Sequence, residues 1–438
     1  MPTRSSEYKP LLFTTTIRSP WRIKHFLNIL ERFNGADLTD ELAQTIMGEV
    51  IRYGLYRPMK GHTDSIIKKW GGKRVSEKSP IGLTPLSDIE VQSLLRSNPQ
   101  QHGEAGFTPG WPSRFATIFD FSKELGFVFY QPGNKIEFSE VGLKLARSVN
   151  IKIENNDIVV STEDVQYEQQ AFINALVKYQ RNNPFVRALN ENRPLVLLLQ
   201  VINKINEDKS FNSTGISKLE LPLLLYWKDG NADTLYKRIK KLRADFDYTP
   251  SWEVITQICR DEIMLGKDIV RTEKSIMVDY PDEFIRKMRM TGLISLRGNG
   301  RFIDINRIEQ ETVDHALSKY SSYKNFGSEE EYFAYAAEMD TVFAHHTTVV
   351  VSETEQEEHL NHWVDQFDWV KIRTELVSLS SRALTSDEVL KYLPAPARLE
   401  FLIAVAIKSR YPSVRVLPNY PIDDEGLPTS TAAGIGNT

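Results

Sequence analysis

Residues 280–305 read YPDEFIRKMRMTGLISLRGNGRFIDI and contain two different patterns in succession. The first part, 280–292, has the character of a helix, and in 293–305 two strand-like runs flank Gly298-Asn299-Gly300. Glycine and asparagine tolerate the positive φ values of a tight turn between two strands, so this tripeptide predicts a β-hairpin. The stretch as a whole predicts a helix followed directly by a hairpin.

The same order occurs earlier in the chain without a similar sequence. A helix is expected over 111–125, and behind it 126–146 alternates, turns at Pro132-Gly133-Asn134 and alternates again. A helix followed by a tight hairpin is the order of a winged helix, so the chain repeats an architecture. Three further helices are expected to complete the helical part of the second block, over 193–205, 216–227 and 232–246.

Two capped helices are expected near the start of the chain. Ser19-Pro20 begins a helix that runs to Phe33, and Thr39 caps a second helix that ends at Gly54. Short capped helices in a row favour a helical recognition fold over an α/β enzyme sheet. The polar residues 150–165 are expected to form a surface connection, and 311–375 a helical connector.

Composition limits the class of protein. The 438 residues are 41% hydrophobic and 26% charged, which is typical of globular proteins and excludes disordered and fibrous classes. Cys259 is the single cysteine, so neither an internal disulfide nor a thiolate zinc site is expected. The first residues do not resemble a signal peptide and no run of about 18 apolar residues occurs, which favours a cytoplasmic protein without a membrane segment.

Positive charge is concentrated in three stretches, although the formal net charge of the chain is −4. The stretches are 60–74, 236–243 and 286–301, and the last two lie on predicted helix-and-hairpin units. Such positions favour contacts to the backbone and grooves of double-stranded DNA over a merely solvated face beside partner carboxylates. The candidate DNA-binding residues of these two stretches are Lys237, Lys240, Lys241, Arg286, Lys287, Arg289, Arg297 and Arg301.

The end of the chain contains a carboxylate in an apolar stretch. Residues 394–410 predict a helix that carries Glu400, and 414–420 predict a strand behind it. A helical glutamate beside Arg398 is most often a surface ion-pair partner. In nucleases of the PD-(D/E)XK type, however, a helix presents an acidic residue to a hairpin that carries further carboxylates, which together hold Mg²⁺. The inward positions of this helix are expected to be Leu399, Leu402, Ile403 and Ala406, with an exposed apolar patch near Leu402, Ile403 and Val416.

Several unusual motifs resemble one family. They are TTTIRSPWRI at 14–23, GLY at 54–56, the block 115–146, NYP at 419–421 and DDEGLP at 423–428. Together they resemble the AlwI family of type II restriction endonucleases, and the resemblance spans essentially the whole chain.

The resemblance implies a function and a set of partners. It implies recognition of a short asymmetric DNA site by winged-helix domains, cleavage at a fixed distance by a C-terminal PD-(D/E)XK domain, Mg²⁺ as the cofactor and a companion DNA methyltransferase. Glu400 corresponds to the family's helical active-site glutamate and is the catalytic and metal-ligating candidate. Arg18 and Arg22 of the opening motif join the DNA-binding candidates. The free protein is expected to be a monomer.

The fold class that follows is α+β and multidomain, with mainly helical winged-helix recognition domains and an incomplete α/β restriction-endonuclease-like core. The family's Pro-Asp and the following acidic strand are expected just beyond Thr438, so the chain as given is expected to be inactive. The expected domains are 1–155 and 165–310 for recognition, 311–375 as a helical linker and 376–438 as the truncated nuclease domain.

Other interpretations stay open. The chain is alternatively a sequence-specific DNA-binding protein without catalysis, an inactive fragment of such a nuclease, or a protein-interaction scaffold. Asp423, Asp424 and Glu425 are substitute metal ligands or, more simply, part of a solvated loop. The histidine pairs 345–346 and 359–362 are expected at the surface rather than on a metal.

Overall fold

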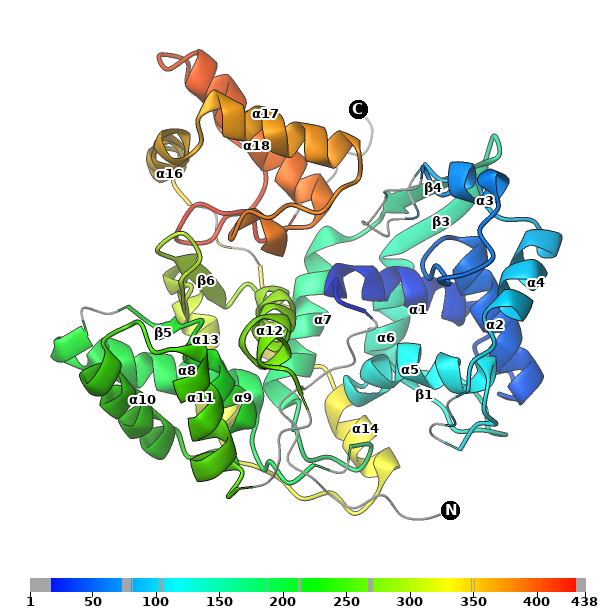
Figure 1. Ribbon diagram of the computed structural model, residues 1–438, viewed down its shortest axis with the longest axis horizontal. Helices are drawn as coiled ribbons and strands as arrows, with labels where there is room; N and C mark the ends of the chain where they lie inside the picture. Colours follow the sequence, from blue (N-terminus) through cyan, green and yellow to red (C-terminus); the bar gives the residue numbers. More distant parts are fainter. Residues whose placement is uncertain are drawn as a thin grey trace. The chain divides into compact units, whose positions relative to one another are not determined.

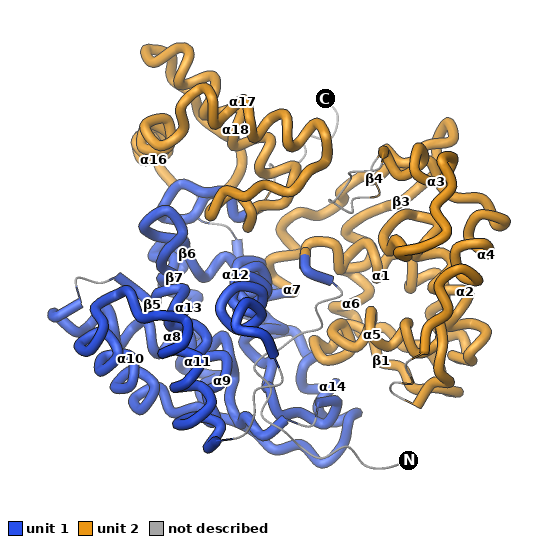
Figure 2. The backbone as a smooth tube through the Cα atoms, viewed as in Figure 1, with its two compact units in different colours: residues 1–18, 172–349, 422–429 blue, residues 19–171, 350–421, 430–438 orange. Residues whose placement is uncertain are grey.

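The structure is a computed structural model that describes residues 17–72, 80, 82–101, 103, 106–186, 188–211, 214–266, 271–347, 349 and 351–430. Contacts between Cα atoms divide the chain into two compact units (Figure 2). Unit 1 comprises 1–18, 172–349 and 422–429, and unit 2 comprises 19–171, 350–421 and 430–438. The units are contact clusters, so the domain boundaries expected from the sequence stay a prediction.

Helices make up most of unit 1. Each of the three helices expected ahead of the second hairpin is present, although the one expected over 216–227 begins only at Leu221, because Ile216–Ser217 form a strand. The helix that precedes this hairpin is present as well. Asn231 caps the longest of these helices by accepting a hydrogen bond from the Thr234 amide at 3.1 Å. The helices are α8 (Pro194–Glu207), α9 (Leu221–Tyr226), α10 (Ala232–Phe246), α11 (Trp252–Ile258) and α12 (Tyr280–Arg289), all labelled in Figure 1.

A small sheet completes this part of unit 1. Strands β6 (Ile294–Arg297) and β7 (Phe302–Ile305) form the predicted hairpin, and β5 (Ile216–Ser217) pairs with β7, so that the strand order is β5-β7-β6. All three residues of the Gly298-Asn299-Gly300 turn have positive φ, with 54° at Asn299. The turn chemistry therefore formed the hairpin where the sequence predicted it.

Further helices of unit 1 follow the hairpin. They are α13 (Gln310–Tyr320), α14 (Glu329–Ala337) and α15 (Thr341–Ala344). His346, expected at the surface, is instead buried, and its Nε2 lies 2.7 Å from Glu309 Oε2. A carboxylate partner on one of the two ring nitrogens, Nε2, helps to offset the cost of burying the imidazole.

Unit 2 begins with the two expected helices. The Thr39 hydroxyl accepts from the Leu42 amide at 3.2 Å, which confirms the predicted cap. Helix α7 (Val165–Lys178) is shared by the two units. The other helices of this part are α1 (Ile23–Glu31), α2 (Asp40–Arg52), α3 (Asp64–Lys69), α4 (Asp88–Ser97), α5 (Trp111–Glu124) and α6 (Glu140–Arg147).

Unit 2 contains two hairpins where one was expected. Strands β1 (Val128–Phe129) and β2 (Glu137–Phe138) form the predicted one, but it is shorter than expected, because residues 140–147 form helix α6 and not the rest of the second strand. The expectation of a surface connection at 150–165 is wrong, because β3 (Val149–Glu154) and β4 (Asp157–Thr162) pair along their full length. Their turn is Asn155-Asn156 with φ of 50° and 68°, a conformation that asparagine tolerates better than most residues.

The last part of unit 2 is helical. It contains α16 (Glu353–Gln366), α17 (Trp369–Ser380) and α18 (Ala395–Arg410). The strand expected at 414–420 is absent from these described residues, which have no regular structure. No described helix is long and apolar enough to cross a bilayer.

The buried face of α18 differs from the one expected. Phe401, Leu402 and Val405 are buried, and the Phe401 ring contacts the rings of Trp363 and Phe367 at centroid distances of 5.6 and 5.9 Å. Contact with this aromatic cluster sets which face of α18 is buried, and that face differs from the expected one. The apolar residues Leu399, Ile403 and Ile407 therefore stay exposed. The expected inward positions are therefore correct for Leu402, wrong for Leu399 and Ile403, and met in part by Ala406, which is half-buried. Of the residues expected in an exposed apolar patch, Ile403 is exposed, Val416 is half-buried and Leu402 is buried.

Candidate nucleic-acid interface

Helix α10 carries the first group of candidate cations on its outer face. Lys237 and Lys241 are exposed, and within the described part of the chain neither makes an ion pair. Lys240 is also exposed, but its ammonium lies 2.5 Å from Asp208 Oδ2. The opposite face is apolar, with Leu235 and Ile239 fully buried. The helix thus presents three lysines to solvent, of which Lys240 makes an ion pair and the other two, among the described residues, do not.

A buried ion pair holds α10 against the sheet. Arg243, on the inner face of the helix, donates to both carboxylate oxygens of Glu220 at 2.7 Å and to the Gly215 carbonyl at 2.7 Å. Gly215 directly precedes β5, which pairs with β7. Farther along, Tyr248 and Phe302 make an edge-to-face ring contact at 5.6 Å. The lysine face and the hairpin therefore belong to one packed body.

The hairpin turn adds an arginine to the same body. Arg301 is exposed, and its guanidinium lies 5.7 Å from the centroid of the Phe302 ring. Its backbone carbonyl accepts from the Lys218 amide at 2.9 Å, which ties the turn to the chain behind β5. Arg307, just after β7, is also exposed. Sequence reasoning missed Arg307 because it lies beyond the predicted hairpin.

The candidates on α12 point inward. Lys287 is fully buried and its ammonium lies 2.5 Å from Glu283 Oε2. Burial lowers the pKa of Lys287, and the charge of Glu283 opposes that shift. Arg289 is buried as well, while Arg286 is half-buried. This helix uses its basic residues largely for contacts within the protein.

The two arginines of the opening motif are placed differently from each other. Arg18 is 64% exposed, with its Nε 3.6 Å from Glu283 Oε1. Arg22 is buried, donates to the Leu55 carbonyl and stacks its guanidinium 5.2 Å from the Phe26 ring centroid. Thr14, Thr15 and Thr16 of the motif lie outside the described residues, as do Lys73 and Arg74 of the first basic stretch.

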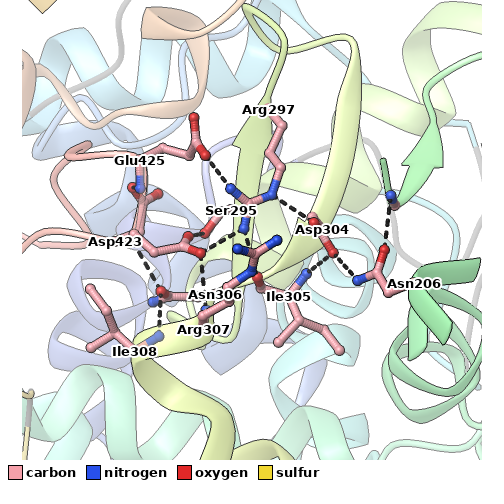
Figure 3. Close-up of polar contacts among 12 residues, drawn as sticks. Asn206, Ser295, Arg297, Asp304, Ile305, Asn306, Arg307, Ile308, Asp423 and Glu425 are labelled. Atoms are coloured by element: carbon pink, nitrogen blue, oxygen red, sulfur yellow. Dashed lines mark hydrogen bonds and ion pairs between the residues drawn. The ribbon is translucent and has the colours of Figure 1, made fainter. Parts of the chain in front are cut away.

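Arg297 of β6 lies among three carboxylates (Figure 3). Its Nε is 2.6 Å from Asp304 Oδ2, its Nη2 is 2.6 Å from Asp424 Oδ2, and its Nη1 contacts Glu425. Burial alone would lower the pKa of Arg297, but Asp424 and Asp304 raise it above the usual arginine value. Arg297 is thus a permanent cation that is neutralised inside the protein.

The acidic stretch 423–425 is not the solvated loop expected from the sequence. Asp423 is fully buried, and its Oδ1 accepts from the amides of Glu425 at 3.1 Å and Leu427 at 2.9 Å. Its Oδ2 accepts from Arg289 Nη1 at 3.0 Å. Burial raises the pKa of Asp423, and Arg289 opposes this shift. The stretch is an ordered turn bound to unit 1.

Glu400, the catalytic candidate, is half-buried on α18. Burial raises the pKa of Tyr420, and the charge of Glu400 adds to the shift. No group of three or more histidine, cysteine or acidic side chains among the described residues is arranged to hold a metal ion. The described residues around Glu400 therefore do not fit the Mg²⁺ that the family resemblance implies, and no chemical step can be derived through this ion.

The comparison with known proteins identifies the class of protein. A family model described as AlwI restriction endonuclease matches residues 123–341, which is half of the chain. The match covers part of unit 2 and most of unit 1, including the hairpin β6–β7 and α10. The chain belongs to the AlwI restriction endonuclease family.

Two other comparisons with known proteins do not identify a family. No curated protein matches the sequence. One similar solved structure is titled "Crystal structure of pyrene- and phenanthrene-modified DNA in complex with the BpuJ1 endonuclease binding domain". It is 14% identical in sequence, with a TM-score of 0.34, and the match covers 71% of this chain and 96% of that chain.

Proposed function

We propose that this chain is a type II restriction endonuclease that reads a short asymmetric site in double-stranded DNA and cuts outside it, beside a companion methyltransferase. Family membership supports the class of reaction. Three exposed cations, Lys237, Lys241 and Arg301, are the observation that supports DNA binding. The buried pair Arg243–Glu220 and the sheet hold them on one packed body.

Unit 1 would act as the recognition part. Its order of helix, strand, helix, helix and, later, hairpin, with the strand order β5-β7-β6, supports the winged-helix interpretation. In such an arrangement a basic helix and the hairpin turn contact phosphates and an adjacent groove. Lys237, Lys240 and Lys241 are the proposed phosphate contacts of α10, and Arg301 is the proposed contact of the turn.

A specific observation favours a second candidate function. The described residues assemble no carboxylate cluster for a metal, so the chain is alternatively a DNA-binding protein without catalysis. The two functions share the same interface and differ only in the cutting step. Under the alternative, Glu400 has no role beyond its place on α18.

A cleavage assay on plasmid DNA tests the proposal. Supercoiled, unmethylated plasmid incubated with Mg²⁺ and the product of the complete open reading frame should be converted to discrete linear fragments, and the Glu400→Gln variant of that product should bind DNA but leave the plasmid intact. Binding of a labelled 30-base-pair duplex without any cutting by either protein would support the non-catalytic alternative. Failure to bind duplex DNA at low salt would contradict both and favour a protein-interaction scaffold.

A further inference from the structure

The hairpin β6–β7 has two unlike faces. In its register, Ser295 lies opposite Asp304 and Arg297 opposite Phe302, so these four side chains share one face. The alternate residues, such as Leu296 and Ile303, are buried in the core of the unit. An antiparallel hairpin packed on a core normally leaves its polar face to water. Here Ser295 and Asp304 on that face are fully buried, so another part of the chain covers them.

Two parts of unit 1 cover these two side chains. Asn206 of α8 donates to Asp304 Oδ1 at 2.8 Å. The segment 422–429, which follows α18 in the sequence but belongs to unit 1 by its contacts, covers Ser295. Asp424 accepts from the Ser295 hydroxyl, from Arg297 and, at 3.2 Å, from the Arg307 amide. The Asp424 amide donates to Asn306 Oδ1 at 3.1 Å. These contacts bind backbone and side chain of the segment to strand β6 and to Asn306 and Arg307, the two residues just after β7 (Figure 3).

A second arginine contacts the segment near both of its ends. Arg289, on α12, donates to Asp423 at 3.0 Å and to the Pro428 carbonyl at 3.1 Å. Within the segment, Ile422 and Pro428 form a β-bridge and the Gly426 amide donates to the Asp423 carbonyl at 2.8 Å. Gly426 has a φ of 78°, which suits glycine. The segment is therefore a closed turn that is bound by the guanidinium groups of Arg289 and Arg297.

We propose that Arg289 and Arg297 form an intramolecular docking site for residues 422–429, here named the acidic turn, and that this dock positions the helix that carries Glu400. Residues 411–422 join Arg410 of α18 to the turn, and a chain of this length spans at most about 45 Å. With the turn docked, Arg410 at the C-terminal end of α18 cannot lie farther than this from the turn. The inference rests on the proposed function, in which such a limit helps to fix the distance between the recognised site and the cut.

The dock also explains why Arg297 is a poor candidate for DNA contact. Four carboxyl groups, Asp304, Asp423, Asp424 and Glu425, face two guanidinium groups. Each of the three guanidinium nitrogens of Arg297 is already paired with a carboxylate, so Arg297 has little left to offer a phosphate placed on this face of the hairpin. Arg289 and Arg297 are therefore positioning residues, and the DNA-facing side of the hairpin is the one that presents Arg301.

Distance measurements between two spin labels test the dock without any DNA. Glu311, exposed on α13 in unit 1, and Ile403, exposed on α18 in unit 2, are replaced by cysteine and labelled. Cys259 does not compete for the label, because it is fully buried and burial raises its pKa. The otherwise unchanged chain should give a distance distribution whose upper limit is set by the docked linker 411–422, and Arg297→Gln should widen it at least twofold.

Two further variants make the test decisive. Asp424→Asn with Glu425→Gln leaves the hairpin side chains intact, so it should widen the distribution even if Arg297→Gln weakens the sheet. Arg301→Gln, in the same hairpin but outside the dock, should leave the width unchanged. An unchanged distribution in both the Arg297 variant and the double variant, with circular dichroism showing folded proteins, would overturn the proposal.

Binding to a labelled 30-base-pair duplex distinguishes two roles of the acidic turn. The turn either only docks on Arg297, or it covers Arg297 until DNA displaces it. If the turn only docks, Arg297→Gln binds the duplex within about twofold of the unchanged chain. If DNA displaces the turn to reach Arg297, Asp424→Asn with Glu425→Gln binds about tenfold more tightly, which would overturn the proposal. Since the spin-label result needs no DNA, failure of the proposed DNA binding would leave the dock to be judged separately.

Discussion

Arg243 and Glu220 form a two-pronged ion pair inside unit 1, with Nε 2.7 Å from Oε1 and with side chains only 3% and 2% exposed. Arg243 comes from the C-terminal half of α10, and Glu220 lies between β5 and α9. The pair therefore joins the helix that presents the exposed lysines to the strand that extends the hairpin sheet. The geometry of the proposed interface depends on it.

Loss of Glu220 should be costly. Glu220→Ala leaves the Arg243 guanidinium buried without its carboxylate, and breaking a buried pair in this way costs about 3–5 kcal/mol. We expect the free energy of unfolding, measured with urea, to fall by about that amount. Exchanging both residues, Arg243→Met with Glu220→Leu, should cost less than the single change. A loss below 1 kcal/mol for Glu220→Ala would show that the pair does not hold the helix in place.

Gly142 of α6 should tolerate no side chain. A Cβ atom there would lie 1.8 Å from the carbonyl oxygen of Phe127, and backbone cannot yield as a flexible side chain can. Gly142→Ala should lower the free energy of unfolding by about 3 kcal/mol or prevent folding. Gly48→Ala in α2 is the matched control, because its Cβ would meet only Val91 Cγ1 at 3.4 Å. Alanine favours helix, so the control should remain within about 1 kcal/mol of the unchanged chain.

The stability of the protein should fall in acid partly through His25. Burial, followed by the charges of Lys24 and Arg22, lowers the pKa of this imidazole to about 3. The unfolded chain therefore takes up a proton below about pH 6.5 that the folded chain refuses down to about pH 3. Between these limits His25 costs up to about 1.4 kcal/mol of stability per pH unit.

Replacement of His25 isolates this effect. Urea unfolding at pH 6.5, 5.5 and 4.5 should show a weaker decrease in stability for His25→Gln than for the unchanged chain, whatever the absolute stability of the variant. Lys135→Gln, an exposed change that removes a charge without touching His25, should keep the original slope. Equal slopes in the histidine variant and the unchanged chain would show that His25 titrates normally in the folded protein.

Local signals in the sequence predicted much of the fold. The Gly298-Asn299-Gly300 turn, the Thr39 cap and the helices ahead of the second hairpin all follow from residue preferences that act over a few positions. The hairpin at 149–162 differs from the expected surface connection, because its polar residues lie on paired strands joined by the Asn155-Asn156 turn. That signal was present and local, and turn chemistry would have found it.

The candidate interface was predictable only in part. Spacing indicated that Lys237 and Lys241 share an exposed face, and the structure agrees. Spacing could not show that Arg289 and Arg297 would meet Asp423 and Asp424, because these partners lie more than a hundred residues away in the sequence. The pair of Glu283 and Lys287 is local, at i and i+4 on one helix, and spacing could have indicated it. The same contacts turned the apparent solvated loop at 423–425 into a buried turn. Long-range pairing of charges depends on tertiary packing, which a single sequence does not reveal.

The salt dependence of DNA binding tests most directly whether α10 and the hairpin turn grip a duplex. Four phosphate contacts, by Lys237, Lys240, Lys241 and Arg301, predict a slope of log K against log salt of about −3.6 and a loss of affinity of about 150-fold between 50 and 200 mM. Lys237→Gln with Lys241→Gln should reduce the slope to about −1.8, whereas the equally exposed pair Lys135→Gln with Lys152→Gln should leave it unchanged. Equal slopes for the two double variants, or binding that does not respond to salt, would contradict this interface.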